Sequence, residues 1–219
     1  MFDGIARRYD LLNHLLSLNQ DARWRRRAAE ALDENPAACV LDLCGGTGDQ
    51  TLAILKAGRA GLVVCCDFSH AMLERAVPKL GGKAAVLQGD GLRLPFADAT
   101  FDGVTVSFGV RNFHDMDAGL REIFRVLRPG GRLVVLEFSA PTAPVLAVMY
   151  RFYLKRVLPR LGDGVSGKTG PYGYLARTIS EFDDPATLAG RIREAGFAGV
   201  GWTPMSGGIV CLHAAMKRA

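Results

Sequence analysis

The feature that most constrains the fold is an apolar run that breaks into a glycine-rich turn. Residues 40–49 read Val-Leu-Asp-Leu-Cys-Gly-Gly-Thr-Gly-Asp, and Asp67 ends the next apolar run. Glycines at the start of a helix let backbone amides approach a ligand closely. An acidic residue at the tip of the second strand, about 20 residues after the turn, can accept hydrogen bonds from a ribose diol. The pattern therefore predicts a β-α-β unit that binds a nucleotide-containing cofactor through Gly45, Gly46, Gly48 and Asp67.

The turn departs from the G-x-G-x-x-G pattern of dinucleotide-binding proteins. Gly46 and Gly48 supply the first two glycines, but Thr51 stands at the third position. This argues against a cofactor that carries a pyrophosphate. The form LDxxGGTGD instead resembles the first motif of class I S-adenosylmethionine methyltransferases. On the turn alone, any other α/β nucleotide fold with a tight turn remains the alternative.

Apolar runs alternate with helical stretches along the chain, which is typical of a parallel, doubly wound α/β sheet with right-handed crossovers. Strands are predicted at 39–43, 62–66, 84–88, 103–108 and 132–138, with helices at 51–56, 71–80 and 118–127. After a helix at 185–195, strands at 199–203 and 209–216 form a hairpin. The predicted fold class is therefore a Rossmann-like α/β sheet, mostly parallel with one antiparallel C-terminal strand, as in class I methyltransferases.

The 219 residues are predicted to form a single domain. We divide it into an N-terminal helical lid (1–35), a cofactor-binding core (36–138), an acceptor and lid insertion (139–182) and a C-terminal helix with an antiparallel hairpin (183–219). No apolar run reaches the length of about 18 residues that a membrane span needs, and no signal-peptide pattern opens the chain. A cytoplasmic location is therefore predicted.

The five cysteines show no CxxC spacing and the four histidines are scattered. This predicts reduced thiols rather than disulfides, and no metal site. The net charge of +5 is uneven, because basic residues gather together with large apolar residues in 1–27 and 145–170. Basic amphipathic segments are typical of surfaces for anionic lipid or nucleic acid. Each segment could equally be a solvated helix face that packs on the sheet. No basic and aromatic RNA-binding module is visible, so no nucleic-acid partner is expected.

Ligands of doubly wound sheets bind outside the carboxyl ends of the strands. Residues at the ends of the first four predicted strands are therefore candidate cofactor contacts: Thr47, Asp67, Asp90, Gly91 and Ser107. For Asp49, an N-cap of the following helix is an equal alternative to ligand contact. Asp90 could instead cap its own loop. Asp67 is the safest assignment, because both its position and its spacing agree.

Four blocks spread over nearly the whole chain together resemble one family. They are FDGIARRYDLLN (2–13), LDLCGGTGD (41–49), SFGVRNFHD (107–115) and YGYLARTI (172–179). The resemblance is to the ubiquinone/menaquinone biosynthesis C-methyltransferases, within the class I S-adenosylmethionine-dependent methyltransferases. The Gly-Val-Arg-Asn segment is far more specific than the glycine turn. The family often has Asn-Ala where Asp90 and Gly91 stand here.

The resemblance implies S-adenosylmethionine as the methyl donor and a membrane-borne polyprenylated quinol as the acceptor. The expected reaction is the C-methylation of demethylmenaquinol to menaquinol. One alternative is methylation of 2-polyprenyl-6-methoxy-1,4-benzoquinol in ubiquinone biosynthesis. An alternative from another class is a non-catalytic, adenosylmethionine-binding scaffold of a quinone-synthesis complex.

Methyl transfer to a ring carbon needs an electron-rich ring, which a quinol has and a quinone lacks. Deprotonating a phenol-like hydroxyl with a pKa of ~10 costs about 4 kcal/mol at pH 7. A guanidinium cannot act as a free base, but it can stabilise the phenolate. In the family an Arg-Asn pair at this place is thought to hold a water near the acceptor. We therefore predict Arg111 and Asn112 as catalytic residues, ahead of His114, with the proton leaving through water. The alternative for Arg111 is an ion pair with Glu137 or an aspartate that braces the loop.

A hydrophobic tail requires the enzyme to meet the membrane or to shield the chain. The segment 145–161 places apolar and aromatic residues on one face beside basic ones, and with the basic N-terminal helix it could form a mouth at the bilayer. The predicted acceptor pocket comprises Phe152, Tyr153, Tyr172 and Tyr174. Ordinary core and lid packing is the alternative. Transient contact with the inner face of the cytoplasmic membrane is expected, and a homo-oligomer is left open.

Overall fold

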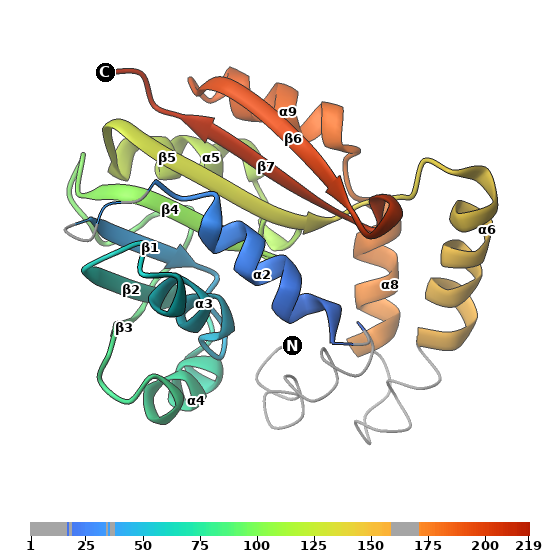
Figure 1. The fold of residues 1–219 in the computed structure, drawn as a ribbon, viewed down its shortest axis with the longest axis horizontal. Helices are drawn as coiled ribbons and strands as arrows, with labels where there is room; N and C mark the ends of the chain where they lie inside the picture. The colour runs from blue at the N-terminus through green and yellow to red at the C-terminus, as the bar shows by residue number, and fades with distance from the viewer. Residues whose placement is uncertain (1–16, 18, 34, 36–37, 159–170) are drawn as a thin grey trace.

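The computed structural model describes residues 17, 19–33, 35, 38–158 and 171–219, and its centre is one seven-stranded sheet (Figure 1). The strand order is β3-β2-β1-β4-β5-β7-β6. The strands are β1 (Cys39–Leu43), β2 (Leu62–Asp67), β3 (Ala85–Gln88), β4 (Phe101–Ser107), β5 (Leu127–Phe138), β6 (Ala198–Met205) and β7 (Val210–Met216). Strands β1 to β5 pair in parallel, whereas β7 runs antiparallel to both β5 and β6. The predicted fold class is confirmed.

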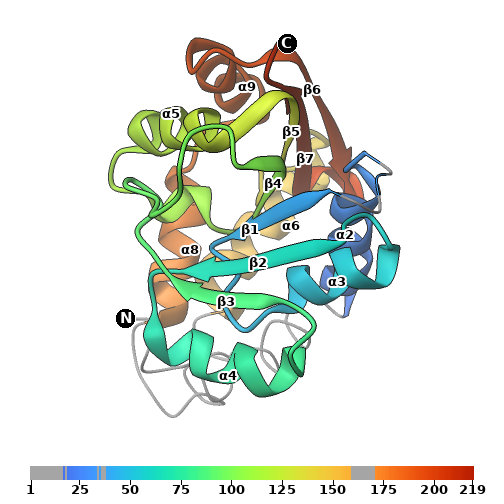
Figure 2. The ribbon, with the colours of Figure 1, turned by 90° about the vertical axis from the view of Figure 1, so that its left-hand side faces the viewer.

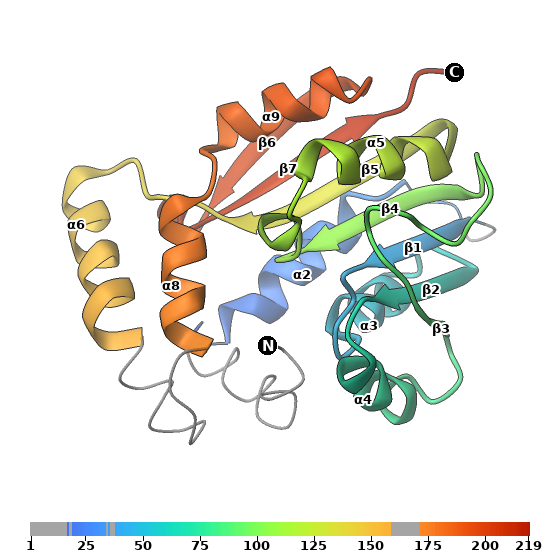
Figure 3. The same cartoon turned by 180° about the vertical axis from the view of Figure 1, so that it is seen from behind.

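Helices cover both faces of the sheet. They are α2 (Gln20–Glu30), α3 (Asp49–Ala57), α4 (His70–Leu80), α5 (Met116–Val126), α6 (Pro144–Phe152), α8 (Pro171–Glu181) and α9 (Pro185–Glu194), with short turns η2 (Val110–Asn112), η3 (Tyr153–Val157) and η4 (Ser206–Gly208). Figure 1 shows α2 and α3 in front of the sheet, and Figure 3 shows α5 and α9 on the opposite face. Seen from the β3 edge in Figure 2, the sheet lies between these two layers.

Strand side chains are buried on both faces, as a sheet covered by two helical layers requires. One face, with Leu41, Val104 and Leu133, packs against α5 and α9. The other face, with Val40 and Val134, packs against α2 and α3. The nearly continuous apolar runs of the central strands therefore reflect burial on both sides.

Helix starts and strand ends differ from the predicted ones by a few residues. Helices α4, α5 and α9 begin after Ser69, Asp115 and Asp184, whose side chains accept hydrogen bonds from backbone amides of the first turn. Strand β5 begins at Leu127 rather than at 132, because Leu127 already pairs with Phe101 of β4. These polar caps and strand pairs set the boundaries that the apolar pattern leaves open.

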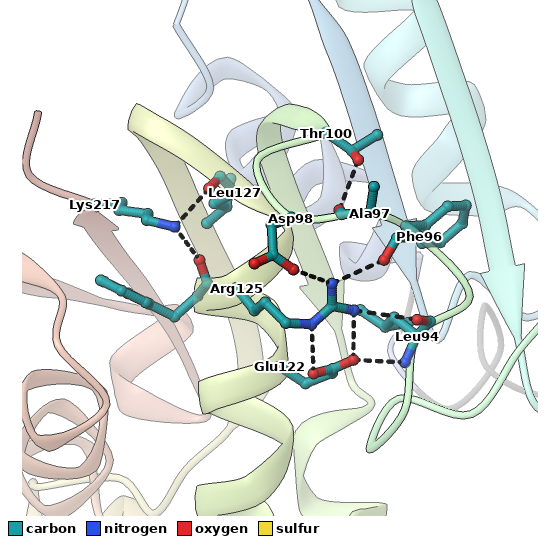
Figure 4. A network of polar contacts seen from close by, with 10 residues as sticks. Leu94, Phe96, Ala97, Asp98, Thr100, Glu122, Arg125, Leu127 and Lys217 are labelled. Carbon is teal, nitrogen blue, oxygen red and sulfur yellow. Dashed lines mark hydrogen bonds and ion pairs between the residues drawn. The ribbon is translucent and has the colours of Figure 1, made fainter.

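At the amino ends of β4 and β5, Arg125 of α5 binds the connection that leads from β3 to β4 (Figure 4). Its guanidinium donates hydrogen bonds to the carbonyl oxygens of Leu94 and Phe96 and pairs with Asp98 at 2.7 Å. Glu122 accepts from Arg125 at 2.9 and 2.7 Å and from the amide of Leu94 at 2.9 Å. This network braces the end of the sheet that lies away from the glycine turn.

Helices α6 and α8 and the π-helical turn η3 lie beyond the carboxyl end of β5 (Figures 1 and 3). They share a separate apolar cluster that includes Tyr150, Leu154 and Ile179. Among the described residues, no helix is both long enough and apolar enough to cross a membrane. Together, α6, η3 and α8 form a helical layer beyond the carboxyl end of the sheet.

Candidate active site

The glycine turn closes directly onto the end of β2. The amide of Gly45 donates to the carbonyl oxygen of Cys66 at 3.0 Å, and the amide of Gly46 donates to Oδ2 of Asp67 at 2.8 Å. A Cβ atom on Gly45 would lie 2.6 Å from Sγ of Cys65, so no larger residue fits there without a shift. The turn and Asp67 thus form one rigid unit at the start of α3.

Asp67 stands at the predicted strand tip, and its other oxygen, Oδ1, accepts from the amide of Ser69 at 2.8 Å. Each carboxylate oxygen can accept more than one hydrogen bond, so this geometry leaves capacity for ribose hydroxyls. Asp90 is exposed and accepts from the amide of Leu92 at 2.9 Å. The loop-capping interpretation of Asp90 therefore describes this structure, and its contact with a cofactor stays a prediction.

Gly91 lies beneath the ring of Phe113, because a Cβ atom there would come within 2.9 Å of that ring. Asp49 is not an N-cap, since Gly48 takes that position. The carboxylate of Asp49 pairs with Lys79 of α4, whose ammonium also reaches Oγ1 of Thr47 at 3.4 Å. Lys79 is a neighbour of the glycine turn that sequence reasoning missed, and a lysine near the end of an ordinary amphipathic helix offered no signal for it.

Ser107 ends β4 beside the turn that follows β1. It is buried, and its Oγ has no hydrogen-bond partner within the described parts of the chain. Buried hydroxyls are normally paired, so an unpaired one needs an explanation such as a bound water or ligand. An adenosyl cofactor across the ends of β1, β2 and β4 would supply polar atoms there. The glycine turn, Asp67 and Ser107 together fit such a group.

The segments that follow β1 and β4 share an unusual backbone conformation. Cys44 and Phe108 directly follow the two strands and have φ values of 57° and 59°, which side-chain-bearing residues seldom adopt. Gly109 makes close packing between the two loops feasible, since a Cβ atom there would lie 2.4 Å from Cβ of Cys44. Such strain is stored where the surrounding structure enforces it, often at functional sites.

Arg111 and Asn112 belong to the short turn η2 after β4, which lies against α8. The Arg111 side chain is 4% exposed, and its Nη1 donates to Oε1 of Glu137 and to the carbonyl oxygen of Phe108, each at 2.6 Å. The ion pair with Glu137, foreseen as the alternative for Arg111, is thus present. A guanidinium held in one place can still stabilise a neighbouring anion, so the catalytic role stays a prediction.

The predicted acceptor residues are only partly brought together. The Tyr174 hydroxyl donates to Oδ1 of Asn112 at 3.3 Å, which joins a predicted pocket residue to a predicted catalytic one. Tyr153 is half-buried in the cluster of α6 and α8, whereas Phe152 is 63% exposed and points to solvent. The side chain of Tyr172 lies outside the described residues, as does the block at 2–13.

Tyr150 is a neighbour of this site that the sequence did not single out. It is 9% exposed, and burial raises its pKa well above the ordinary value, with the charges of Arg111 and Glu137 also acting on it. Tyr150 and Phe152 are two residues apart and so lie on roughly opposite sides of the helix, where Tyr150 is buried and Phe152 is exposed. Both are aromatic residues in an apolar stretch, so residue type alone could not separate them.

A groove of about 680 Å³ opens beside η2. Arg111, Phe113 and His114 line it, together with carboxylates at the start of α5 and the end of α8. Arg191 of α9 spans it, paired with Asp117 at 2.9 Å and with another carboxylate at 2.6 Å. This groove is polar and charged, so it does not suit an isoprenoid tail.

Together, the sheet order, the glycine turn, Asp67 and the buried Ser107 define a class I S-adenosylmethionine-dependent methyltransferase. The chain belongs to the ubiE/COQ5 methyltransferase family, whose model matches residues 1–217. It is 51% identical over 221 residues to a demethylmenaquinone methyltransferase of Mycolicibacterium vanbaalenii, covering 99% of this chain and 93% of the relative. A demethylmenaquinone methyltransferase of Corynebacterium kroppenstedtii is 48% identical, with 99% and 93% covered.

Among solved structures, a methyltransferase of Thermotoga maritima superposes with a TM-score of 0.72 at 18% identity, covering 99% of this chain and 98% of that one. At that identity the likeness concerns the fold alone, because one fold supports many reactions. Family membership confirms the predicted methyltransferase activity and the S-adenosylmethionine cofactor. The recognised resemblance is likewise confirmed.

Proposed function

We propose that this enzyme transfers a methyl group to a ring carbon of demethylmenaquinol and so produces menaquinol. The observation that carries the proposal is identity of about one half to demethylmenaquinone methyltransferases over nearly the full length of both chains. The same relatives favour a naphthoquinol over the benzoquinol alternative. Methylation of the methoxybenzoquinol stays the second candidate, which the experiment below includes.

S-adenosylmethionine supplies, when bound, a methyl group on a positively charged sulfonium. We propose that the glycine turn, Asp67 and Ser107 hold it, with Asp67 binding the ribose hydroxyls. Asp67 and the backbone of the turn already contact one another, so little reorganisation is needed on binding. Asp90 and Gly91 extend the same edge at the end of β3.

The acceptor would meet Arg111 and Asn112 at the end of β4. The guanidinium lies in a buried, low-dielectric site, where it stabilises a developing phenolate far more than it would in water. We propose that the Arg111 guanidinium offsets the cost of about 4 kcal/mol for deprotonating the acceptor hydroxyl at pH 7. Asn112, oriented by Tyr174, would hold the acceptor or a bound water in place.

We also propose that α6 brings the enzyme to the membrane in which the quinol resides. Val145, Val148, Met149 and Phe152 are 75%, 59%, 63% and 63% exposed and recur at helical spacing along one face. Basic residues lie among and after them at Arg151, Lys155 and Arg156, all exposed, and the segment 144–157 contains no acidic residue. An apolar face flanked by cations is complementary to an anionic bilayer surface.

The activity is tested by methyl transfer from labelled S-adenosylmethionine to two chemically reduced, short-tailed acceptors, a demethylnaphthoquinol and a methoxybenzoquinol. Preferential turnover of the naphthoquinol is expected, and the oxidised quinone should not react. Preference for the benzoquinol would move the assignment to the second candidate. Binding of the donor without turnover of either acceptor would refute the proposal and favour the scaffold alternative.

The membrane proposal is tested by co-sedimentation with vesicles of phosphatidylglycerol and of phosphatidylcholine. Binding to the anionic vesicles should fall in the M149D variant, whereas V77D, at an exposed valine on α4, should bind as the wild type does. Equal binding of M149D and V77D would show that α6 is not the contact. Methyl transfer to a water-soluble acceptor should be unaffected in both variants.

A further inference from the structure

The ion pair between Arg111 and Glu137 leaves two buried polar atoms without a hydrogen-bond partner among the described residues. Glu137 lies at the end of β5, and its side chain is 1% exposed. Its Oε1 accepts from Nη1 of Arg111 at 2.6 Å and from the amide of Phe138 at 2.8 Å. Its Oε2 is buried and has no hydrogen-bond partner among the residues that the structure describes.

The partner residue has a matching deficiency. Nε of Arg111 is also buried and unpaired within the described part of the chain, although the guanidinium lies 5.4 Å from the centre of the Phe138 ring. One ion pair therefore presents an unused donor and an unused acceptor to its surroundings. Buried polar atoms of this kind are normally satisfied by an ordered water or by a ligand group.

Groups from several elements surround Glu137. Arg111 comes from η2, Tyr150 from α6 and Cys44 from the loop after β1, and each acts on Glu137 or is acted on by it electrostatically. Cys211 stands opposite it on β7. Burial raises the pKa of Glu137, while the charge of Arg111 and hydrogen bonds lower it, with burial prevailing. A carboxylate in such surroundings is a stronger base than one in water.

We propose that Glu137 is a positioning residue that fixes Arg111 and accepts, at Oε2 and through one water, the proton that the acceptor hydroxyl loses. The inference rests on the proposed function, since it assumes a phenol-like acceptor beside Arg111. In the step, the O–H bond of the acceptor breaks and an O–H bond forms on Glu137, with the water passing on one proton as it takes one. The electron pair of the broken O–H bond remains with the acceptor oxygen and delocalises into the ring. The ring carbon then forms a bond to the methyl group while the bond between that methyl group and the donor sulfur breaks, and its electron pair stays on sulfur. The proton returns to the product oxygen, and the proton displaced from the ring carbon goes to solvent.

The experiment compares E137Q with the wild type in methyl transfer to reduced demethylnaphthoquinol. Glutamine keeps the shape and an acceptor oxygen but cannot take up a proton, so kcat should fall by about a hundredfold or more while KM changes little. The fall of kcat at acidic pH, expected in the wild type, should be absent from the variant. A matched control is E122Q, whose carboxylate pairs with Arg125 at the far end of the sheet (Figure 4) and whose kcat per folded molecule should equal the wild-type value.

An E137Q enzyme with wild-type kcat and an unchanged pH profile would overturn the proposal. If E137Q melts or loses affinity for S-adenosylmethionine, E137A assayed with added formate decides instead. Recovery of kcat with formate, absent in E122A, supports a proton acceptor, and no recovery overturns it. Failure of the wild type itself on the naphthoquinol would count against the proposed function and not against Glu137.

Glu137 can also be examined without any acceptor. Its raised pKa means that the native state binds more protons than the unfolded state, so its stabilising contribution is lost as pH rises. The free energy of unfolding of E137Q relative to the wild type should therefore grow with pH. Parallel pH curves for the two proteins would show that Glu137 does not titrate as the proposal requires.

Discussion

Replacing Asp42 by asparagine should change the pH dependence of stability. Asp42 is fully buried on β1, where Oδ2 accepts from Thr51 Oγ1 at 2.6 Å and Oδ1 accepts from Thr105 Oγ1 at 3.1 Å. Burial raises its pKa to about 6, although the two hydroxyls and the charge of Arg25 work in the opposite direction. Asparagine has nearly the same shape and no charge.

The magnitude follows from the two pKa values. In the unfolded chain Asp42 ionises near its ordinary value of 3.8, whereas in the native state it keeps its proton up to about 6. Its contribution to stability is therefore fully present below about pH 4 and is lost as pH rises to about 6. The complete loss is about 3 kcal/mol, of which about 1.5 kcal/mol falls between pH 5 and pH 8.

The assay is urea unfolding at several pH values, followed by tryptophan fluorescence and circular dichroism. D42N should gain about 1.5 kcal/mol relative to the wild type between pH 5 and pH 8. G201A, which changes no titratable group and places a Cβ atom where nothing lies within 4 Å, serves as the control and should run parallel to the wild type. A D42N curve that also runs parallel would refute the claim that burial dominates the titration of Asp42.

Two further substitutions test the packing and the cofactor contact. G109A places a methyl group 2.4 Å from Cβ of Cys44, so it should cost about 1–3 kcal/mol in urea unfolding and lower kcat by displacing η2. G201A, where a Cβ atom meets nothing within 4 Å, should be neutral, and equal stability of the two variants would refute the steric argument. D67N should weaken binding of S-adenosylmethionine by about tenfold to a hundredfold in calorimetry, because hydrogen bonds to a charged acceptor are lost. Unchanged affinity would remove Asp67 from the cofactor site.

Local patterns were sufficient for the scaffold of the site. The apolar runs that end in Gly45, Asp67 and Ser107 placed these residues at the carboxyl ends of three strands, and the sheet brings those ends together. Parallel strands run in the same direction, so their carboxyl ends lie at one edge of the sheet, where ligands of such sheets bind. The predicted limits of the strands were less accurate. The start of β5, for example, depends on the pairing of Leu127 with Phe101 of β4.

The contacts of Asn112 and the burial of Tyr150 could not be predicted without the tertiary structure. The hydrogen bond between Tyr174 and Asn112 joins residues far apart in sequence, and the choice of Tyr150 over Phe152 as the buried aromatic depends on how α6 meets α8. No periodicity within one element specifies which face of a helix meets a distant loop.

The strands, the glycine turn and the Arg-Asn segment could be predicted from the amino-acid sequence, because strand alternation, glycine conformation and motif spacing are local properties. The pairing of Arg111 with Glu137, and the one buried atom that each leaves without a partner among the described residues, became visible in the folded chain. The physical reason is that burial and desolvation depend on every element packed around a group, and the sequence near that group does not contain this information.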